Sequence, residues 1–460
     1  MEYVHSSRAR PPLPPGPFLV VGLARSGVAV ARALKGRGED VFGVDAGRPQ
    51  GLGDLDLAGV EYETDTDGIA SLSGVATVVK SPGVPKEAEV VAEARRLGIP
   101  VVGELEIGWR MIDAAFVGIT GTNGKTTTTE LLAHVLRTAG RPVHAVGNIG
   151  SPLSALAEEP VVADATVVCE CSSFQLEDIE CFGPECAVYL NLAPDHLDRH
   201  GSMEEYGRSK RRIFINQVEG DVAVLNEADP AIAGLKPPGR ASVVRFLPAG
   251  ESQNPVDVTN ENGVISVDGR SLLPTADLQL IGHHNVANAM AAAAAALSLG
   301  LPREAVAEGL RSFSGVAHRL EPVAEVNGVR FVNDSKATNV EATATALASF
   351  DSGVRLILGG SLKGESFAPL VDAVRASCAG VYLIGESADE ISEALAGPGI
   401  GPVPVEDCGN LEAAVSRAWD ESGAGETVLL SPACASFDQF RDYEDRGDRF
   451  RRLVGTIDVG

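Results

Sequence analysis

The segment from Ala114 to Gly140 limits the possible folds more than any other part of the sequence. An apolar stretch (AAFVGIT) leads into GTNGKTT, and a helical pattern (TTTTELLAHVLRTAG) follows. In such a loop backbone N–H groups surround a phosphate, a lysine reaches the outer phosphates, and a threonine hydroxyl can ligate Mg²⁺. The strict GxxxxGK motif would need a glycine at residue 119, five residues before Gly124, and residue 119 is Ile. The strand–loop–helix order still predicts a nucleotide-binding loop of Gly121, Thr122, Asn123, Gly124, Lys125, Thr126 and Thr127.

Strand and helix patterns alternate from Phe18 onward in this chain of 460 residues, which predicts an α/β protein with mainly parallel, doubly wound sheets. We expect three domains: a Rossmann-like N-terminal domain (1–103), a P-loop ATPase-like central domain (104–314) and a Rossmann-like C-terminal domain (315–460). Residues 1–17 contain PPLPPGP and are expected to form a loose arm. The predicted strands are FLVVG, DVFGVD, ATVVKSPG, IPVVG, AAFVGIT, ATVVCECS, CAVYLNL, DVAVLN, VRFVND, VRLILGG, GVYLIG and TVLLSP.

The composition excludes several classes of function. The formal net charge is −25, which disfavours binding to nucleic acid or to an anionic membrane surface. There is no apolar run long enough to insert into a membrane, and no hydrophobic signal sequence at the start. Seven cysteines without a CxxC pair indicate a reducing, cytoplasmic location. Cys169 and Cys171 alternate on a predicted strand, so packing on one face is favoured over a zinc site. The sequence does not set the oligomeric state, and a monomer is the working expectation.

The N-terminal block begins like a dinucleotide-binding fold. GLARSG (22–27) joins a strand to a helix, and Asp45 ends the next strand near the spacing of a ribose-binding acid. Ala24 occupies the position of the central glycine, and its Cβ disfavours a nicotinamide cofactor there. A diphosphate at the helix N-terminus remains compatible with the pattern. The same crevice is expected to include Ser26, Ser81, Pro82 and Gly83.

The central block has further polar residues at the ends of predicted strands. Glu170 ends one strand and is a candidate Mg²⁺ ligand. His196 lies in an Asp-rich turn after the next strand and is a candidate active-site group. Lys210 lies among arginines in a chain where only eight of the 38 Lys and Arg residues are lysines, although a solvated lysine is an equal alternative. Asn285 and Asn288 share one helix face and either contact a nucleotide base or cap the helix.

The C-terminal block has three polar loops, each after a predicted strand. NDSKATN contains Asp334, Lys336 and Thr338, LGGSLKGESF contains Lys363, and SPACASFDQF contains Ser436. The carboxyl ends of parallel strands meet at one edge of an open sheet, where ligands bind. We therefore expect these loops to line a crevice. Arg319 is a lone basic residue at the entrance to this block.

Taken together, six motifs resemble the Mur ligase family of ATP-dependent, amide-forming enzymes of peptidoglycan precursor synthesis. They are TGTNGKTTT, SSFQLE, DHLDRHG, GVAHRLE, NDSKATN and SPACASFDQF. The first also fits folate polyglutamate ligases. The set as a whole resembles the branch that joins D-glutamate to UDP-N-acetylmuramoyl-L-alanine through an acyl phosphate. The resemblance implies ATP, Mg²⁺ at two sites and a carbamylated lysine.

The resemblance also implies a role for each matching residue. Lys125, His196, Lys210 and Lys336 match catalytic positions. The metal ligands would be Thr126, Glu170, His196 and carbamylated Lys210. Besides the phosphate loop, the ATP side would include Asn148, Asn285, Asn288, Arg319 and Asp334. The D-glutamate pocket would include Thr338, Lys363, Ser436 and Phe437. The uridine diphosphate would contact Ser26, Asp45, Ser81, Pro82 and Gly83, and the muramoyl end would lie near Ser172, Ser173 and Gln175.

Three alternatives stay open on the sequence alone. A ligase with another amino acid substrate, such as a folylpolyglutamate-type enzyme, would share the phosphate loop. A non-enzymatic nucleotide-binding module would not need all of Lys125, Glu170, His196, Lys210 and Lys336. An NAD-dependent oxidoreductase is disfavoured by Ala24 and by the separate phosphate loop. The general base for the amine is also not assigned by the sequence, and His196 is one candidate.

Overall fold

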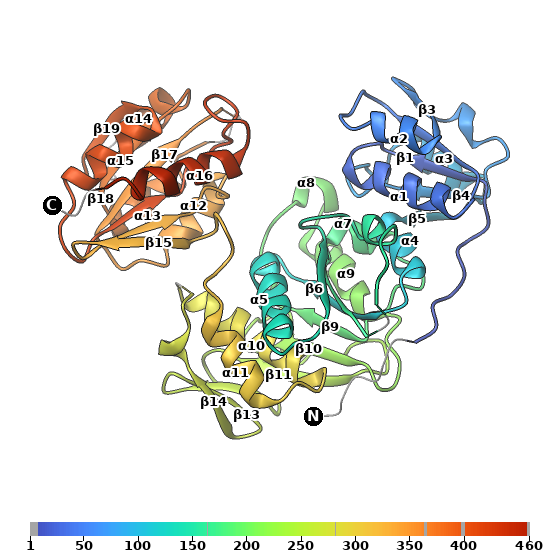
Figure 1. The fold of residues 1–460 in the computed structure, drawn as a ribbon, viewed down its shortest axis with the longest axis horizontal. Helices are drawn as coiled ribbons and strands as arrows, with labels where there is room; N and C mark the ends of the chain where they lie inside the picture. The colour runs from blue at the N-terminus through green and yellow to red at the C-terminus, as the bar shows by residue number, and fades with distance from the viewer. Residues whose placement is uncertain (1–7, 163, 281, 363–365, 397–400, 458–460) are drawn as a thin grey trace. The chain divides into compact units, whose positions relative to one another are not determined.

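The computed structural model describes residues 8–162, 164–280, 282–362, 366–396 and 401–457 (Figure 1). The chain forms two compact units, which are described separately below. Unit 1 contains the described residues up to Leu278 together with His284–Phe313, and unit 2 contains Gln279–His283 and the described residues from Ser314 onward. Unit 1 therefore includes both the first and the second predicted blocks, each with a sheet of its own.

The first sheet of unit 1 has five parallel strands in the order β3-β2-β1-β4-β5. Its apolar side chains alternate between two cores. One core lies against α1, α2 and α4, and the other lies against α3. Both faces of the central strands are therefore covered, which explains why β1 (FLVV) is apolar throughout. The elements are β1 (Phe18–Val21), α1 (Arg25–Gly36), β2 (Val41–Asp45), α2 (Gly53–Ala58), β3 (Glu61–Thr64), η1 (Ala70–Leu72), β4 (Thr77–Lys80), α3 (Glu89–Arg96), β5 (Val101–Gly103) and α4 (Glu104–Met111).

The second sheet of unit 1 has nine strands in the order β14-β13-β12-β11-β10-β9-β6-β8-β7. Strands β6 to β12 are parallel to one another, whereas β13 and β14 are antiparallel additions at one edge. Helix α5 packs against β6, β7 and β8, and α11 packs on α5. The strands are β6 (Ala115–Thr120), β7 (Val143–Gly147), β8 (Thr166–Glu170), β9 (Cys186–Tyr189), β10 (Val222–Asn226), β11 (Ser242–Leu247), β12 (Val258–Glu261), β13 (Val264–Val267) and β14 (Arg270–Pro274).

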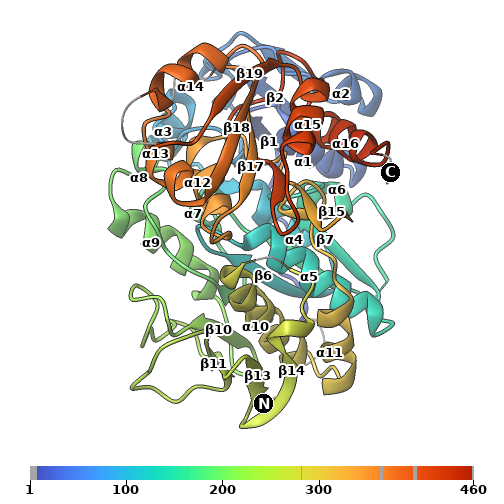
Figure 2. The same ribbon diagram turned by 90° about the vertical axis from the view of Figure 1, so that its left-hand side faces the viewer.

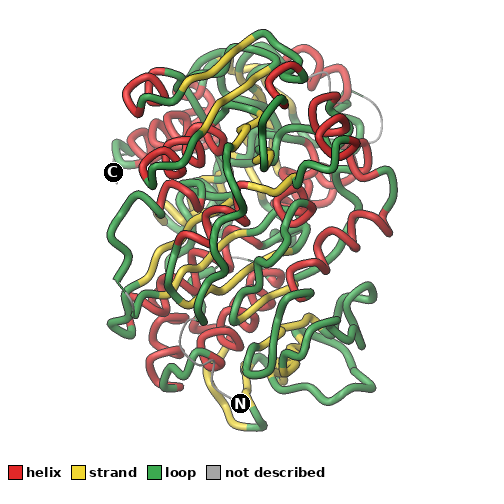
Figure 3. Tube along the Cα trace, turned by 90° about the vertical axis from the view of Figure 1, so that its right-hand side faces the viewer, coloured by secondary structure: helices red, strands yellow, loops and turns green. Residues whose placement is uncertain are grey.

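The helices around this sheet pack closely, and Figure 3 traces them in red along the Cα path. A Cβ on Gly309 of α11 would lie 2.7 Å from the Cα of Val135 in α5, so glycine permits this close approach. The alanine-rich α10 is buried along most of its length. The helices are α5 (Lys125–Thr138), α6 (Leu153–Leu156), α7 (Ser173–Glu177), α8 (Leu197–His200), α9 (Met203–Arg211), η2 (Arg212–Phe214), η3 (Thr275–Asp277), α10 (His283–Ser298) and α11 (Arg303–Ser312).

Unit 2 has one sheet of six strands in the order β15-β16-β20-β17-β18-β19, parallel except for β15. Helices α12, α13 and α14 share one apolar core with it, and α15 and α16 share the other (Figure 2). This is the predicted doubly wound arrangement. The elements are β15 (Glu321–Val326), β16 (Val329–Asn333), α12 (Val340–Leu347), β17 (Val354–Gly359), α13 (Leu370–Ser377), β18 (Cys378–Ile384), α14 (Ala388–Leu395), β19 (Val405–Gly409), α15 (Leu411–Asp420), β20 (Thr427–Leu430) and α16 (Tyr443–Val454).

The described part of the N-terminal arm differs from the predicted loose segment. Arg10 is buried and pairs with Glu185, Nη1 to Oε1, at 2.9 Å. Its guanidinium lies 4.6 Å from the centroid of the Trp109 ring and 5.1 Å from that of Phe116. Arg8 pairs with Asp221 at 2.9 Å. The sequence pattern suggested a loose arm because proline-rich segments lack regular backbone hydrogen bonds, but two arginines anchor this one to the central sheet.

We expect Arg10→Met to lower the melting temperature of the protein by about 5 °C or more. Removing one partner of a buried ion pair costs about 3–5 kcal/mol, and each kcal/mol is worth about 2 °C or more in a unit of this size. Thermal unfolding followed by circular dichroism measures the change. The control is Arg375→Met, because Arg375 pairs with Asp372 on the exposed surface of unit 2. Equal melting temperatures for Arg10→Met and the wild type would contradict the anchoring.

Candidate functional site

The predicted phosphate loop lies between β6 and α5, at the carboxyl edge of the nine-stranded sheet. Gly124 has φ +81°, and a Cβ there would lie 2.3 Å from Oδ1 of Asn288. Glycine is thus needed both for the backbone conformation and for the approach of α10. Asn288 donates to Oδ1 of Asn285 at 2.8 Å. The structure therefore brings the two predicted asparagines of α10 against the loop.

Lys125 and Thr126 begin α5 and face different parts of this loop. The Lys125 Nζ donates to the carbonyl oxygens of Gly121 at 3.0 Å and Thr122 at 2.7 Å. The Thr126 hydroxyl donates to Oε2 of Glu170 at 2.9 Å. The lysine thus lies over the loop, and the threonine points toward the neighbouring strand β8.

Glu170 is held at the end of β8 by contacts on both carboxylate oxygens. Its register partner on β6 is Ile119, just before the loop. Oε2 accepts from Thr126, and Oε1 accepts from Nδ2 of Asn148 at 2.8 Å. The side chain is almost fully buried. A buried carboxylate beside a threonine hydroxyl is an oxygen donor set that suits Mg²⁺.

Asn191, which the sequence analysis did not select, shapes the phosphate loop directly. Its Oδ1 accepts from the backbone N–H of Thr122 at 3.0 Å and of Asn123 at 2.8 Å. Its Nδ2 donates to the carbonyl of Asn123 at 3.0 Å. The signal in the sequence was a polar residue just after a fully apolar strand (CAVYL) next to β6.

Lys210 of α9 is buried beside the same loop. Its Nζ donates to the Gly121 carbonyl at 2.7 Å and lies 4.4 Å from the centroid of the Tyr206 ring. Burial, followed by repulsion from Lys125, lowers the pKa of the Lys210 amine to about 6, against the opposing effects of Asp195 and Glu170. The amine is therefore largely neutral at pH 7. Lys210 is buried, so the alternative interpretation of the sequence, a solvated surface lysine, is wrong.

His196 and His200 lie in an aromatic cluster next to Lys210. His196 adopts φ +52° before α8, is half exposed, and its Nε2 lies 3.3 Å from Oδ2 of Asp195. His200 is buried, stacks on Phe174 with ring centroids 5.1 Å apart, and lies 5.0 Å from the Tyr206 ring. Burial, with nearby cations, lowers the pKa of His200 to about 4, so this imidazole is neutral.

The muramoyl-side residues predicted from SSFQLE lie at the start of α7. Ser172 and Gln175 form a capping box, in which each side chain accepts from the other residue's backbone N–H. Ser173 is buried, and its hydroxyl lies 2.9 Å from Nε2 of His200. These contacts link the predicted muramoyl segment to the aromatic cluster.

In the five-stranded sheet, the predicted uridine-side residues meet at the ends of β2, β1 and β4. Asp45 accepts from the backbone N–H of Leu23 at 2.6 Å and of Gly47 at 2.8 Å. The Ser81 hydroxyl donates to the Gly22 carbonyl at 2.6 Å. Ser26 lies in the first turn of α1. The structure therefore brings these three loops together, with Asp45 and Ser81 bonded to the turn itself.

In unit 2, the predicted loops follow β16, β20 and β17, which are adjacent in the sheet. Asp334 is buried and accepts from the Leu320 N–H at 3.0 Å and the Ser431 hydroxyl at 2.8 Å. Burial raises the pKa of the Asp334 carboxyl to about 7, although these hydrogen bonds and the charge of Arg319 act in the opposite direction. The Lys336 Nζ lies 5.6 Å from the centroid of the Tyr443 ring.

The remaining predicted residues of unit 2 have different exposures. Ser436 is buried, whereas the Phe437 side chain is largely exposed. The Thr338 N–H donates to the carbonyl of Lys336 at 2.9 Å, which continues the turn after β16. Lys363 lies outside the described residues. The predicted ATP-side set is thus divided, with Arg319 and Asp334 in unit 2 and the phosphate loop in unit 1.

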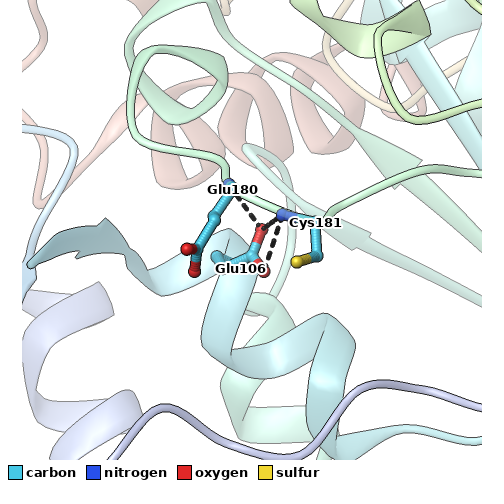
Figure 4. A group of neighbouring side chains, drawn as sticks. All are labelled: Glu106, Glu180 and Cys181. Atoms are coloured by element: carbon cyan, nitrogen blue, oxygen red, sulfur yellow. Dashed lines mark hydrogen bonds between the residues drawn. The ribbon is translucent and has the colours of Figure 1, made fainter.

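One further group in the described part of the chain has atoms placed like metal ligands: Glu106, Glu180 and Cys181 (Figure 4). Its hydrogen bonds explain it without a metal. The Glu106 carboxylate accepts from the N–H groups of Glu180, Cys181 and Phe182 and from Nε of Arg110 at 2.7 Å. Glu106 therefore fixes a turn. Cys169 and Cys171, by contrast, are packed in the core, as predicted from their alternation.

Comparison with known proteins identifies the family. The model of the Mur ligase middle domain matches residues 119–296, and that of the Mur ligase, glutamate ligase domain, matches residues 318–434. A UDP-N-acetylmuramoylalanine–D-glutamate ligase of Pelotomaculum thermopropionicum is 44% identical over 448 residues, covering 96% of this chain and 98% of its own. Ligases of the same name from Solibacter usitatus and Myxococcus xanthus are 41% and 42% identical, covering 96% and 95% of this chain and 98% of their own.

Solved structures agree in fold. The UDP-N-acetylmuramate-alanine ligase of Thermotoga maritima has a TM-score of 0.57 at 20% identity, covering 96% of this chain and 99% of its own. A pseudomurein peptide ligase type C from Methanothermus fervidus has a TM-score of 0.56 at 22% identity, covering 96% and 100%. The chain belongs to the Mur ligase family. In the described residues, every helix is too short or too polar to span a bilayer.

We expect Asn191→Ala to speed amide hydrogen exchange at Asn123 by about tenfold. The Asn123 N–H loses its acceptor, which costs about 1–2 kcal/mol of local stability. The Thr122 N–H keeps its bond to the backbone carbonyl of Asn191 at 3.1 Å and is expected to change less. Hydrogen exchange followed by mass spectrometry measures the change. Asn410→Ala is the matched control, because Asn410 caps α15 in unit 2. Unchanged exchange at the loop in Asn191→Ala would show that Asn191 does not order it.

Proposed function

We propose that the chain is an ATP-dependent amide ligase that joins D-glutamate to UDP-N-acetylmuramoyl-L-alanine and releases ADP and phosphate. The relatives that carry this name are 38–44% identical across at least 95% of the chain. The observation on the molecule that carries the proposal is the convergence of Lys125, Thr126, Glu170 and Lys210 on one loop.

The reaction divides into two group transfers. An oxygen of the alanyl carboxylate attacks the γ-phosphorus of ATP, and the bond to ADP breaks. The neutral amine of D-glutamate then attacks the carbonyl carbon of the acyl phosphate, loses a proton, and expels phosphate from a tetrahedral intermediate. Negative charge accumulates at each stage, so positioned cations and hydrogen-bond donors supply most of the catalysis.

On the ATP side, the phosphate loop and Lys125 bind the phosphates. The other residues assigned to ATP are Asn148, Asn285, Asn288, Arg319 and Asp334. Thr126 and Glu170 hold one Mg²⁺, and their oxygen atoms and burial fit this hard cation. The metal, when bound, neutralises charge on the phosphate oxygens. Asn148 keeps the Glu170 carboxylate turned toward Thr126.

A second Mg²⁺ is assigned to His196 and to Lys210 in carbamylated form. The neutral Lys210 nitrogen attacks CO₂, a nitrogen–carbon bond forms, and one proton leaves to water. The lowered pKa of this amine, caused by burial and by Lys125, favours the reactive neutral state. The product is a carboxylate-like oxygen ligand, which an arginine cannot become.

The substrates are divided among the three predicted domains. Residues 1–103 bind the uridine diphosphate through Ser26, Asp45, Ser81, Pro82 and Gly83. Residues 104–314 bind ATP, with Ser172, Ser173 and Gln175 near the muramoyl group. Residues 315–460 bind D-glutamate, where its two carboxylates need cationic and hydroxyl partners. Those partners are Thr338, Lys363 and Ser436 with Phe437, and Lys336 acts beside them on the reacting groups.

We place the reaction in the cytoplasm and expect the enzyme to act as a monomer. All seven cysteines are free in the structure, which fits a reducing compartment. The strongly negative net charge fits a small-molecule enzyme that does not bind nucleic acid.

Phosphate release by the purified protein tests the proposed function. With ATP, Mg²⁺ and UDP-N-acetylmuramoyl-L-alanine, we expect release with D-glutamate and at least about 100-fold less with L-glutamate or other amino acids. The reason is that a chiral pocket places only one amine against the acyl phosphate. Lys125→Ala is the inactive control. Release with a different amino acid would overturn the substrate assignment, and no release with any would overturn the ligase function.

We expect Lys210→Ala to lower kcat at least about 100-fold, because an oxygen ligand beside the phosphates is lost. Added formate or acetate restores part of the rate by occupying the vacated space, whereas bicarbonate does not. Lys210→Arg keeps a cation but cannot be carbamylated, and is expected to stay inactive with or without these acids. The matched control is Arg208→Ala, an exposed residue of the same helix. Full activity of Lys210→Arg would rule out the carbamate.

A further inference from the structure

Lys80 is one of the few lysines of the chain, and none of the assigned roles uses it. It ends β4 and is almost completely buried. Its Nζ lies 2.9 Å from Oδ2 of Asp178 and donates to the carbonyl of Val84 at 2.9 Å and, at 3.5 Å, to that of Ser81. One carboxylate and two carbonyl oxygens surround the ammonium group, so its positive charge is paired and its N–H donors have acceptors inside the protein.

Asp178 is fixed from several directions. It follows α7, and its carbonyl accepts from the N–H of Gly103 at 2.8 Å. Its Oδ1 accepts from Nη2 of Arg95 at 3.2 Å, while Oδ2 faces Lys80. Helix α7 lies beside β5, so this carboxylate joins the two sheets of unit 1 (Figure 1).

The Lys80–Asp178 pair therefore connects two segments that are assigned to one substrate. On one side Lys80 holds the turn Ser81–Val84, which belongs to the uridine diphosphate site. On the other side it holds the end of α7, which carries Ser173 and Gln175 of the muramoyl site.

A second contact joins the same two regions. Arg199 donates to the Gly83 carbonyl at 3.4 Å while its guanidinium lies 4.6 Å from the centroid of the Phe174 ring. Phe174 is part of α7. The turn after β4 is thus attached to the segments that carry α7 and α8, by Asp178 inside the protein and by Arg199 at its surface.

Lysine suits this position better than the arginine that the chain uses elsewhere. A tetrahedral ammonium directs three donors to a carboxylate and two carbonyls at different angles, whereas a guanidinium presents a planar fork. An unpaired buried charge would be costly, so both partners are needed for either to remain buried.

We propose that Lys80 is a positioning residue that holds the uridine diphosphate turn and the muramoyl helix at a fixed separation before substrate binds. The inference rests on the proposed function, because that function assigns both segments to UDP-N-acetylmuramoyl-L-alanine. A preformed site avoids the cost of ordering both segments on binding and sets where the reacting carboxylate lies.

The test compares substrate affinity among variants of the full chain. Isothermal titration calorimetry without ATP measures the Kd of UDP-N-acetylmuramoyl-L-alanine, and steady-state kinetics gives each KM and kcat. For Lys80→Met we expect Kd and KM for this substrate to rise about tenfold or more, with KM for ATP within about twofold of the wild type. The control Arg95→Met removes the exposed partner of Asp178 and is expected to stay within about twofold.

A double variant separates positioning from stability. Lys80→Met leaves Asp178 buried with only Arg95, and this lowers the melting temperature. Lys80→Met/Asp178→Asn removes both charges, so we expect the melting temperature to recover in part while Kd stays raised. A structural role alone would lower the melting temperature without changing Kd. If Lys80→Met does not fold, Asp178→Asn and Lys80→Arg test the same link, and both are expected to raise Kd.

The outcomes distinguish this inference from the proposed function. Wild-type protein that binds the UDP substrate, together with folded variants that bind it equally well, would overturn the positioning role alone. Wild-type protein that fails to bind the UDP substrate would overturn the proposed function itself. Raised Kd in Lys80→Met and in the double variant, with ATP kinetics unchanged, would establish the positioning role.

Discussion

The parallel pairing of β6 on both of its sides is the constraint on which the site in unit 1 depends. Ile119 lies opposite Glu170 of β8 and Val188 of β9, so the loops after these three strands emerge at one edge. Glu170 then bonds Thr126, and Asn191 binds two N–H groups of the phosphate loop. Lys125 and Lys210 bond the carbonyl of Gly121, so side chains from several elements fix the backbone of the loop.

In the other two sheets, too, the predicted binding residues lie in loops that follow parallel strands at one edge of the sheet. In unit 2 the loop after β20 lies between those after β16 and β17. Ser431, the first residue after β20, donates to Asp334, the first residue after β16, and so joins two of these loops. In the five-stranded sheet Ser81 bonds the turn after β1. Each substrate of the proposed reaction is therefore assigned to the carboxyl ends of parallel strands, where loops can vary without disturbing the core.

The sequence predicted the buried elements better than the exposed ones. All twelve strands that it predicted are present, because a run such as FLVV or TVLL is apolar when both faces are covered. It missed eight strands. Five of them, β3, β7, β14, β15 and β19, lie at sheet edges, and EYET of β3 shows how polar such strands can be. The other three, β11, β12 and β13, are only partly buried. Partners far apart in the chain, such as Lys80 with Asp178 or Arg10 with Glu185, leave no local pattern, and neither pair could be predicted.

In the proposed reaction ATP activates a carboxylate, which an amine then captures. Substrate labelled with ¹⁸O in both oxygens of the alanyl carboxylate tests this directly, with mass spectrometry of the phosphate released in the presence of ATP and D-glutamate. One carboxylate oxygen bridges to phosphorus in the acyl phosphate and leaves with it. We therefore expect one ¹⁸O atom in each phosphate and one in the new amide. Phosphate free of ¹⁸O would mean that water attacks ATP, and would contradict the acyl-phosphate route.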